Sequence, residues 1–407
     1  MKILFLNPSS RLGGAERSLI DVATSLRKSC PECALQAILP ADGQLAVSLA
    51  AIGVRVTVLP FPASLAQAGE SAFSGGVWAR RVRVAFRAVA AVPASCRYVI
   101  ALRREVKRIG PSIVHSNGLK MHVLGALALP RPALLVWHVR DYLTDRPITP
   151  LLLRLVSSRC ALIIANSQSV AADIRHHMRD SVRVVVIYNG IDLIEFSPNG
   201  PAVLPGAAGS VKENAFHVAL IATFANWKGH MTFLKAIRIM STRMPVSAFI
   251  VGGPIYDPTG SQVTLDQLRR TAEQYGIAES VCFTGNVEHT APIMRAMDVV
   301  VHASTKPEPF GRVVAEAMGC ARATVVSRAG GACEVMEEGV TSLGHEPGNQ
   351  EQLATALETL AGNRALRDEM GKAGRERAER LFGRDLIATQ LLPEYEGLML
   401  GREVTEC

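Results

Sequence analysis

The sequence predicts an α/β protein made of two doubly wound, Rossmann-like domains, and three observations carry this prediction. The chain has 407 residues, more than one hydrophobic core usually serves. Short apolar runs alternate with helical stretches in both halves, which is the pattern of parallel sheets covered by helices. Between the halves, residues 197–214 contain repeated prolines and glycines that favour a linker over any regular element.

The first domain is predicted over residues 1–196. Its strands are expected where short apolar runs are bounded by turn-forming residues. These runs are 2–6, 35–39, 54–59, 113–115, 134–138, 162–165 and 182–187. Helices are expected to fill most of the gaps between them, including 15–28, 77–108 and 167–178.

The second domain is predicted over residues 215–385, where strands and helices alternate again. Strands are expected at 217–221, 247–251, 281–284, 299–302 and 324–327, with 341–344 as a further candidate. Helices are expected at 231–240, 265–275, 291–297, 311–318 and 351–360. The tail from 364 to 400 is predicted to be helical with a break at Pro393, because proline lacks the amide donor that a helix interior needs.

Composition limits the class of protein. A hydrophobic fraction of 48% with 20% charged residues indicates a folded globular chain. The first strand is too short for a signal-peptide core, and no stretch reaches the roughly 20 apolar residues of a spanning helix. We therefore expect a cytoplasmic protein. Among eight cysteines, Cys30 and Cys33 form a lone CxxC pair, interpreted as a structural coincidence and not as a redox or zinc site.

The net charge of +8 has a local origin in residues 77–108, where basic and apolar side chains interleave. The basic residues expected to contact a membrane or an acceptor are Arg80, Arg81, Arg83 and Arg87. A basic amphipathic helix can lie on an anionic membrane, which makes the inner membrane face a candidate location. The alternative is a solvated helix packed on its own domain. Nucleic acid is not expected as a partner, because few aromatic residues accompany the arginines and no binding motif is present.

Seven residues separate Glu308 from Glu316 in the segment that carries most of the chemistry. Prolines on both sides of Glu308 forbid a helix there, whereas the residues from 311 to 318 suit one. Glu308 should thus lie on the loop that opens a helix, with Glu316 about two turns inside it. The first-turn amides are then open to an anion or to sugar hydroxyls. They belong to Phe310, Gly311 and Arg312. A glycosidase also uses two carboxylates, but placement of the two glutamates on a loop and on the helix that it opens favours a nucleotide sugar.

Three further positions are candidates for a site at the carboxyl ends of the strands. Gly13 and Gly14 follow the first strand and open a helix, where small residues let backbone amides approach a phosphate. His138 ends a strand, and Lys228 follows the first strand of the second domain. A fixed ammonium there stabilises the charge that grows on a departing diphosphate. Next to His138, Arg140 and Asp141 are expected to form an ion pair.

These elements, taken in order, resemble the retaining glycosyltransferases of family 4, which have the GT-B fold. The residues that carry the resemblance are Gly13-Gly-Ala-Glu16, His138, Asn189-Gly-Ile-Asp192, Lys228-Gly229, Glu308-Pro-Phe-Gly311, Glu316-Ala-Met318, Gly330-Gly331 and Glu334. They span nearly the whole chain.

The resemblance implies two domains that face a central cleft, with a C-terminal helix over 386–407 packed back on the first domain. It implies transfer of a hexose from a nucleotide diphosphate sugar without a metal or other cofactor. The acceptor would be a glycan or a lipid-linked molecule, used in surface polysaccharide or glycoconjugate assembly. His138, Lys228 and Glu308 would be catalytic. Donor binding would fall to Gly13, Gly14, Lys228, Glu308, Phe310, Gly311, Arg312 and Glu316.

Two departures from the family pattern keep rival functions open. An arginine is usual five residues before Lys228, where this chain has Thr223, or just before the tryptophan, where it has Asn226. Arg322 and Ala323 also stand where a Gly-Pro pair is usual. The substitute cations considered are Arg11, Arg312 and Arg328. The alternatives are a non-catalytic GT-B subunit that binds a nucleotide or a partner enzyme, and a sugar-nucleotide epimerase.

Overall fold

The structure is a computed structural model that describes residues 1–62, 65, 77–146, 148–178, 182–205, 215–254 and 262–403, without the side chains of 77–91 and 402–403. The chain divides into two compact units. Unit 1 contains residues 1–190 and the chain from residue 384 onward, and unit 2 contains residues 191–383. The division falls a few residues before the boundary predicted at 196, and the second half of the predicted linker, residues 206–214, lies outside the described residues.

Unit 1 is built on a parallel sheet of seven strands in the order β3-β2-β1-β4-β5-β6-β7. The strands are β1 (Lys2–Leu6), β2 (Ala34–Leu39), β3 (Arg55–Val58), β4 (Ile113–Asn117), β5 (Leu134–Val139), β6 (Cys160–Ala165) and β7 (Val184–Val186). The strand order reverses between β1 and β4, and such switch points are where open α/β sheets bind ligands at their carboxyl edge. The bounds of the seven strands confirm the predicted ones, with shifts of one or two residues at their ends.

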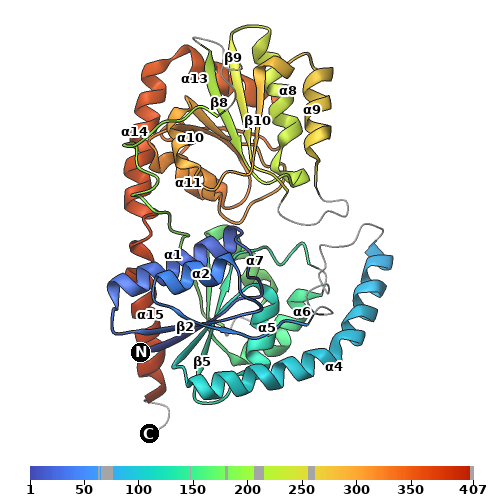
Figure 1. Ribbon diagram of the computed structural model, residues 1–407, viewed down its shortest axis with the longest axis vertical. Helices are drawn as coiled ribbons and strands as arrows, with labels where there is room; N and C mark the ends of the chain where they lie inside the picture. Colours follow the sequence, from blue (N-terminus) through green and yellow to red (C-terminus); the bar gives the residue numbers. More distant parts are fainter. Residues whose placement is uncertain are drawn as a thin grey trace. The chain divides into compact units, whose positions relative to one another are not determined.

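Helices cover this sheet, and the C-terminal helix is one of them. They are α1 (Gly14–Ser29), α2 (Gln44–Ala51), α4 (Val77–Ile109), α5 (Leu119–Ala128), α6 (Thr149–Val156), α7 (Gln168–His177) and α15 (Leu386–Glu403). In Figure 1, α15 runs beside α1, in agreement with their contacts. Ile387, Leu391 and Tyr395 of α15 are buried in the same core as Leu19 and Leu26 of α1.

The predicted helix break at Pro393 is wrong. Pro393 lies inside α15, and the chain instead leaves the helical path between α14 (Arg364–Leu381) and Leu386. A proline inside a helix costs about 3 kcal/mol. Burial of Ile387, Leu391 and Tyr395 on both sides of it offsets that cost, because each large apolar side chain contributes about 1.5–3 kcal/mol.

Unit 2 contains a six-stranded parallel sheet in the order β10-β9-β8-β11-β12-β13. The strands are β8 (Phe216–Ile221), β9 (Val246–Val251), β10 (Val281–Gly285), β11 (Val299–His302), β12 (Ala323–Ser327) and β13 (Ser342–His345). The helices are α8 (His230–Ser241), α9 (Leu265–Gln274), α10 (Ala291–Ala296), α11 (Arg312–Gly319), α12 (Ala332–Val335), α13 (Gln350–Gly362) and α14. The sheet again reverses its order, here between β8 and β11, so its carboxyl edge is the place to look for a ligand site.

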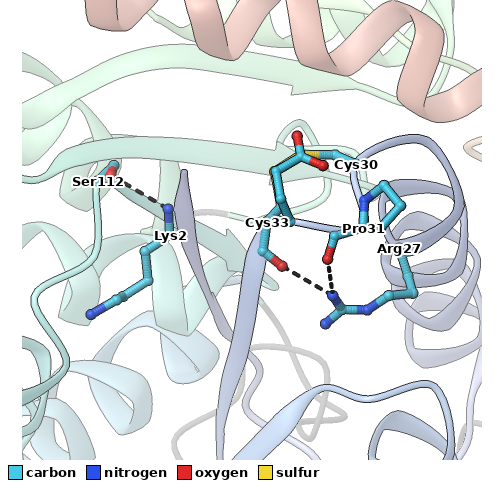
Figure 2. Close-up of a disulfide and its surroundings, with 7 residues drawn as sticks. Lys2, Arg27, Cys30, Pro31, Cys33 and Ser112 are labelled. Carbon is cyan, nitrogen blue, oxygen red and sulfur yellow. Dashed lines mark hydrogen bonds between the residues drawn. A yellow bond between two sulfur atoms is a disulfide. The ribbon is translucent and has the colours of Figure 1, made fainter.

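Cys30 and Cys33 form a disulfide at the connection between α1 and β2, as Figure 2 shows. Both residues belong to the core of unit 1, and their Cα atoms lie 5.4 Å apart, within the usual range for a disulfide. Arg27 donates hydrogen bonds to the carbonyl oxygens of Pro31 and Cys33, which closes the turn. The interpretation of this pair as a coincidence was thus wrong: the turn between helix and strand brings the two sulfurs together.

Within the described part of the chain, no helix is both long and apolar enough to cross a bilayer.

Candidate active site

The segment that carries the two glutamates in unit 2 folds as a loop followed by a helix, as predicted from its prolines. Glu308 lies on the loop after β11, and α11 begins at Arg312. Gly311 caps this helix with φ +86°, a left-handed conformation that suits glycine. A Cβ at Gly311 would also lie 2.9 Å from the Cβ of Ala332. Because the helix begins at residue 312, Glu316 is about one turn inside it, one turn fewer than predicted.

Glu308 is held by a cluster of polar groups at the carboxyl ends of β8 and β11. Lys228 Nζ lies 2.7 Å from Glu308 Oε1, and His302 Nε2 lies 3.1 Å from the same oxygen. The Ser304 hydroxyl donates a hydrogen bond to it as well. Burial raises the pKa of Glu308, but Lys228 and His302 lower it, and the net pKa is well below the usual value. Glu308 is therefore an ionised carboxylate with only 9% of its surface exposed.

Lys228 reaches Glu308 because its short 3-10 turn, η3 (Asn226–Lys228), docks on the end of β11. Gly229 follows with φ +77°, and a Cβ at this position would collide with the carbonyl group of Ala303. The Thr305 amide donates a 2.7 Å hydrogen bond to the Trp227 carbonyl. Glycine is thus required at position 229 for the lysine loop and the glutamate loop to meet.

Arg312 and Glu316, both predicted to bind the donor, form an ion pair on α11. Arg312 Nε lies 2.8 Å from Glu316 Oε1, one helical turn apart. The side chains are 19% and 13% exposed, so the pair lies partly buried at the start of the helix. An arginine carries five N–H donors, and this contact uses the Nε–H. The side chain of Phe310 takes another direction, since its ring packs edge-to-face on Phe382 with a centroid distance of 5.6 Å.

A third loop, after β12, completes this edge of unit 2. The Gly331 amide donates a 2.7 Å hydrogen bond to the Glu308 carbonyl, and Gly330 pairs with Glu308 as an isolated bridge. Arg377 donates to the carbonyl of Glu334, which anchors the following turn. The loops after β8 and β11 and the start of α11 thereby place Lys228, Glu308, Arg312 and Glu316 at the same edge of the sheet, and the loop after β12 supports the backbone of Glu308.

The structure leaves Arg328 outside this cluster. Its guanidinium pairs with Glu338 at 3.0 Å and lies 3.7 Å from Glu346. Of the three predicted substitute cations, Arg312 is the one that the structure brings beside the paired glutamates. Arg11 belongs to unit 1 and is exposed.

In unit 1, the Gly13–Gly14 loop opens α1 at the carboxyl end of β1, but one of its amides is already used. Glu16 accepts a 3.1 Å hydrogen bond from the Gly13 amide, and Asn7 Nδ2 donates to the same carboxylate. The helix thus carries its own acidic cap, which sequence reasoning missed although Glu16 stands at the third helical position. A Cβ at Gly14 would meet nothing within 4 Å, so Gly14 remains the more accessible of the two.

His138 lies one residue before the end of β5, which runs to Val139 and not to 138 as predicted, and it is 2% exposed. Its Nδ1 lies 3.1 Å from His115 Nε2 and 3.0 Å from a terminal nitrogen of Arg140. Arg140 also donates to the side-chain oxygens of Asn117 and Asn189. The expected Arg140–Asp141 ion pair is wrong.

Asp141 accepts its hydrogen bond from Arg146 instead. Arg140 and Asp141 lie in the loop after β5, which ends at Val139, and each is bonded to other residues. Sequence reasoning also missed His115, although it stands on the strand next to β5.

Three buried histidines of unit 1 predict a loss of stability in acid. Burial, and then the charge of Arg140, lower the pKa of His115 and His138 well below the usual value and that of His122 to about 3. In the unfolded chain these groups take up protons near pH 6.5. Since the unfolded state then binds more protons, stability falls as pH drops below about 6.5, by about 1.4 kcal/mol per pH unit for each histidine.

This loss is measurable as a lower urea midpoint at pH 5.5 than at pH 7.5. His122→Gln should reduce the difference, whereas His176→Gln, at an exposed position, should not. An unchanged difference in His122→Gln would contradict the assignment.

The arginines predicted to contact a membrane or an acceptor, Arg80, Arg81, Arg83 and Arg87, are on α4. Their side chains lie outside the described residues. The helix itself is present over Val77–Ile109, as the sequence predicted.

The sequence of the chain matches two family descriptions that together cover most of its length. Residues 43–195 match glycosyltransferase family 4, and residues 208–377 match glycosyl transferases group 1. The chain belongs to glycosyltransferase family 4. This glycosyltransferase is 28% identical over 254 residues to D-inositol 3-phosphate glycosyltransferase of Corynebacterium glutamicum. It is 29% identical over 184 residues to mannosylfructose-phosphate synthase of Agrobacterium fabrum. These matches span 60% and 44% of this chain, and about three fifths and two fifths of the relatives' own lengths.

Solved structures share the fold of the glycosyltransferase along nearly its whole length. HepE of Anabaena in complex with UDP-glucose is 26% identical, with a TM-score of 0.75 and coverage of 98% of this chain and 100% of that one. Sucrose-phosphate synthase of Thermosynechococcus elongatus is 19% identical, with a TM-score of 0.75 and coverage of 98% and 100%. The two parallel-sheet units are thus those of the GT-B fold, as predicted.

Proposed function

We propose that the protein transfers a hexose from a UDP-sugar to a glycan or lipid-linked acceptor, with retention of configuration. The observation that carries this proposal is the ionised Glu308 beside the Arg312–Glu316 pair, with Lys228 held 2.7 Å from Glu308. A nucleotide sugar offers hydroxyls at both ends and two phosphates between them, which is the pattern that carboxylates and cations at one sheet edge can recognise. HepE, with similar sequence along its whole length, was solved with UDP and with UDP-glucose.

Each side chain has a distinct task in the proposed reaction. Glu316 accepts hydrogen bonds from the ribose hydroxyls, and Glu308 accepts them from the donor sugar. Lys228 and Arg312 neutralise the charge that grows on the diphosphate as the glycosidic bond breaks, a form of transition-state stabilisation. The acceptor attacks the face that the diphosphate leaves, and the leaving phosphate takes the acceptor proton. The remaining contribution is alignment of the two substrates.

Metal independence and the absence of a cofactor are part of the proposal. The two glutamates predicted to bind the donor are each paired with a side-chain cation, Glu308 with Lys228 and Glu316 with Arg312. Because each of these carboxylates has a side-chain cation as its partner, neither is assigned to a metal ion. The lysine and the arginine then neutralise the diphosphate. Turnover in the presence of EDTA would support this part, and strict dependence on Mg²⁺ or Mn²⁺ would overturn it.

The donor is tested by release of nucleoside diphosphate from UDP-glucose, GDP-mannose and ADP-glucose in EDTA. We expect release from the UDP-sugar in preference to the other two. Binding of UDP without turnover of any donor would favour a non-catalytic subunit, the rival function that Thr223 and Asn226 motivate. Conversion to an isomeric UDP-sugar without an acceptor would favour an epimerase.

A hollow at the carboxyl edge of the unit 1 sheet is our candidate for acceptor recognition. It has a volume of about 630 Å³ and lies between the loops after β1, β2 and β3. Phe61, Arg11, Asp42 and Gln44 line it together with serine hydroxyls. An aromatic ring, a carboxylate and several hydrogen-bonding side chains are suited to a sugar ring with hydroxyls, which agrees with a glycan as acceptor.

We further propose that the protein works at the inner, anionic face of the membrane, which a lipid-linked acceptor requires. The described residues offer a surface for this contact in addition to the arginines of α4. Leu151, Leu152 and Leu155 of α6 are 59%, 43% and 69% exposed. Leu155 also lines a hollow whose charged residues are all basic: Arg103, Lys107, Arg131 and Arg159. Exposed leucines beside arginines fit an interface of acyl chains and anionic headgroups.

Flotation with liposomes that contain an anionic lipid tests this contact. We expect binding at low salt that weakens at high salt, because the headgroup attraction is screened. Leu151→Ser with Leu155→Ser should reduce binding several-fold, since two apolar side chains leave the interface. Ile194→Ser, which changes an exposed apolar side chain of unit 2, is the matched control. Absence of binding at low salt would contradict the membrane proposal.

A further inference from the structure

A buried chain of hydrogen bonds in unit 1 connects the C-terminal helix to His138. Tyr395 of α15 and His115 of β4 are 0% exposed, and His138 of β5 is 2% exposed. The Tyr395 hydroxyl is hydrogen-bonded to His115 Nδ1, and His115 Nε2 lies 3.1 Å from His138 Nδ1. The two histidines stand on neighbouring parallel strands, and His115 pairs with Val136, two residues before His138. Both imidazoles are thus on the same face of the sheet.

Arg140 fixes the direction of these hydrogen bonds. Its terminal nitrogen lies 3.0 Å from His138 Nδ1, and a guanidinium can only donate. His138 Nδ1 must therefore accept, which places the proton of this neutral imidazole on Nε2. His115 Nε2 meets the same Nδ1 atom and must donate to it. This leaves His115 Nδ1 to accept from Tyr395, a hydroxyl that keeps its proton because burial raises its pKa.

The opposite arrangement would place two N–H groups against each other. If His138 carried its proton on Nδ1, that proton would face the Arg140 N–H 3.0 Å away. A buried donor without an acceptor is costly, by about 1–3 kcal/mol. The guanidinium is held in place from other sides by Asn117 and Asn189, so it cannot turn away cheaply.

We propose that Arg140, His115 and Tyr395 are positioning residues that together hold His138 as the neutral tautomer with its proton on Nε2, ready to donate to an oxygen of the substrate. This inference rests on the proposed transfer function for its consequence in catalysis. Among the described residues, His138 Nε2 is buried without a hydrogen-bond partner, as expected for a donor that awaits a ligand oxygen. His138 then acts as a hydrogen-bond donor and not as the base of the reaction. The C-terminal helix acquires a role in the site through Tyr395.

Nitrogen-15 NMR of histidine-labelled protein tests the tautomer directly and needs no substrate. In the wild type, the His138 signals should show a protonated Nε2 and an unprotonated Nδ1, and His115 should show the same pattern. A proton on Nδ1 of His138 would overturn the proposal. Tyr395→Phe removes only the hydroxyl, and the His115 Nδ1 signal should shift because that nitrogen loses its hydrogen-bond donor, while Nε2 keeps the proton that it donates to His138. Tyr142→Phe is the matched control, because Tyr142 bonds to Ser169, outside this chain of hydrogen bonds.

Kinetics then separates positioning from structural support. Tyr395→Phe should lower kcat about fivefold to tenfold and leave the KM for the UDP-sugar unchanged. His115→Gln keeps an amide donor for His138 and should retain more activity than His115→Leu. Unchanged spectra and unchanged kcat in Tyr395→Phe would overturn the proposal. If NMR shows a protonated Nε2 on His138 but the protein turns over no donor, the transfer function is refuted. The tautomer assignment then still holds.

Discussion

Replacement of Glu316 by alanine is expected to abolish binding of the nucleotide, with an affinity for UDP at least about a hundredfold lower. A carboxylate that accepts hydrogen bonds from two ribose hydroxyls contributes about 1.5–3 kcal/mol for each bond. Two such bonds correspond to two or more orders of magnitude in Kd. The substitution also removes the partner of Arg312, whose Nε lies 2.8 Å from Glu316. Both consequences change the contacts that α11 offers to the nucleotide. The variant should therefore bind UDP more weakly and not only turn over more slowly.

Two variants show whether this loss is specific. Glu316→Gln keeps the size and the acceptor oxygen, and it should retain part of the affinity. Glu358→Ala removes a carboxylate that pairs with Arg243 on the exposed surface of unit 2. It should leave the affinity unchanged, since exposed pairs contribute little. An unchanged Kd in Glu316→Ala would remove the donor-site assignment.

Lys228→Ala is expected to reduce turnover by about a hundredfold to a thousandfold, with a smaller effect on KM. Removal of one group that stabilises transition-state charge typically has this cost. In the proposed reaction the charge on the diphosphate grows as the bond to the sugar breaks, so Lys228 is expected to contribute most in the transition state. Initial rates over a range of UDP-sugar concentrations separate kcat from KM.

Lys228→Ala also affects the stability of the protein through Glu308, and a second substitution separates this effect from the loss of catalysis. Without the ammonium, the buried Glu308 loses a partner 2.7 Å away and its pKa rises. The double variant Lys228→Ala with Glu308→Gln removes the uncompensated carboxylate and should restore stability but not kcat. Lys228→Arg keeps the charge and should retain part of the activity. Wild-type kcat in Lys228→Ala would show that this lysine has no catalytic role.

Much of the fold was predictable because hydrophobic runs and turn residues carry the relevant information locally. The strands of both sheets appeared close to their predicted bounds, and Glu308 lies on the loop that its flanking prolines require. The C-terminal helix packs on unit 1 as expected, and the main error was the break predicted at Pro393. Its proline is a strong local signal against a helix, yet Ile387 and Leu391 bind to a core that is distant in the sequence. Tertiary packing overrides local preference there.

The candidate site was predictable in its residues and less so in its contacts. The motif placed Lys228, Glu308, Arg312 and Glu316 in order, and the structure brings them to one sheet edge. Their pairing depends on loop docking, such as the approach of Gly229 to Ala303, which no local pattern reveals. The same holds for Arg140, which donates hydrogen bonds to Asn117 at the end of β4 and to Asn189, in place of its neighbour Asp141.

The chain of hydrogen bonds from Tyr395 to His138 could not be found from spacing alone. Tyr395 and His115 are separated by 280 positions, and nothing in either local sequence marks them as partners. The available signal was a histidine on the strand beside β5, which becomes meaningful once the order of the parallel strands is known.

Calorimetric titration of the purified protein with UDP, GDP and ADP in EDTA tests the central claim most directly. The wild-type protein should bind UDP saturably and in preference to the other two. The Glu316→Ala variant, shown to be folded by its unchanged circular dichroism, should give no measurable heat with UDP. Equal binding of UDP by both proteins, or no binding by the wild type, would contradict a donor site built on Lys228, Glu308, Arg312 and Glu316.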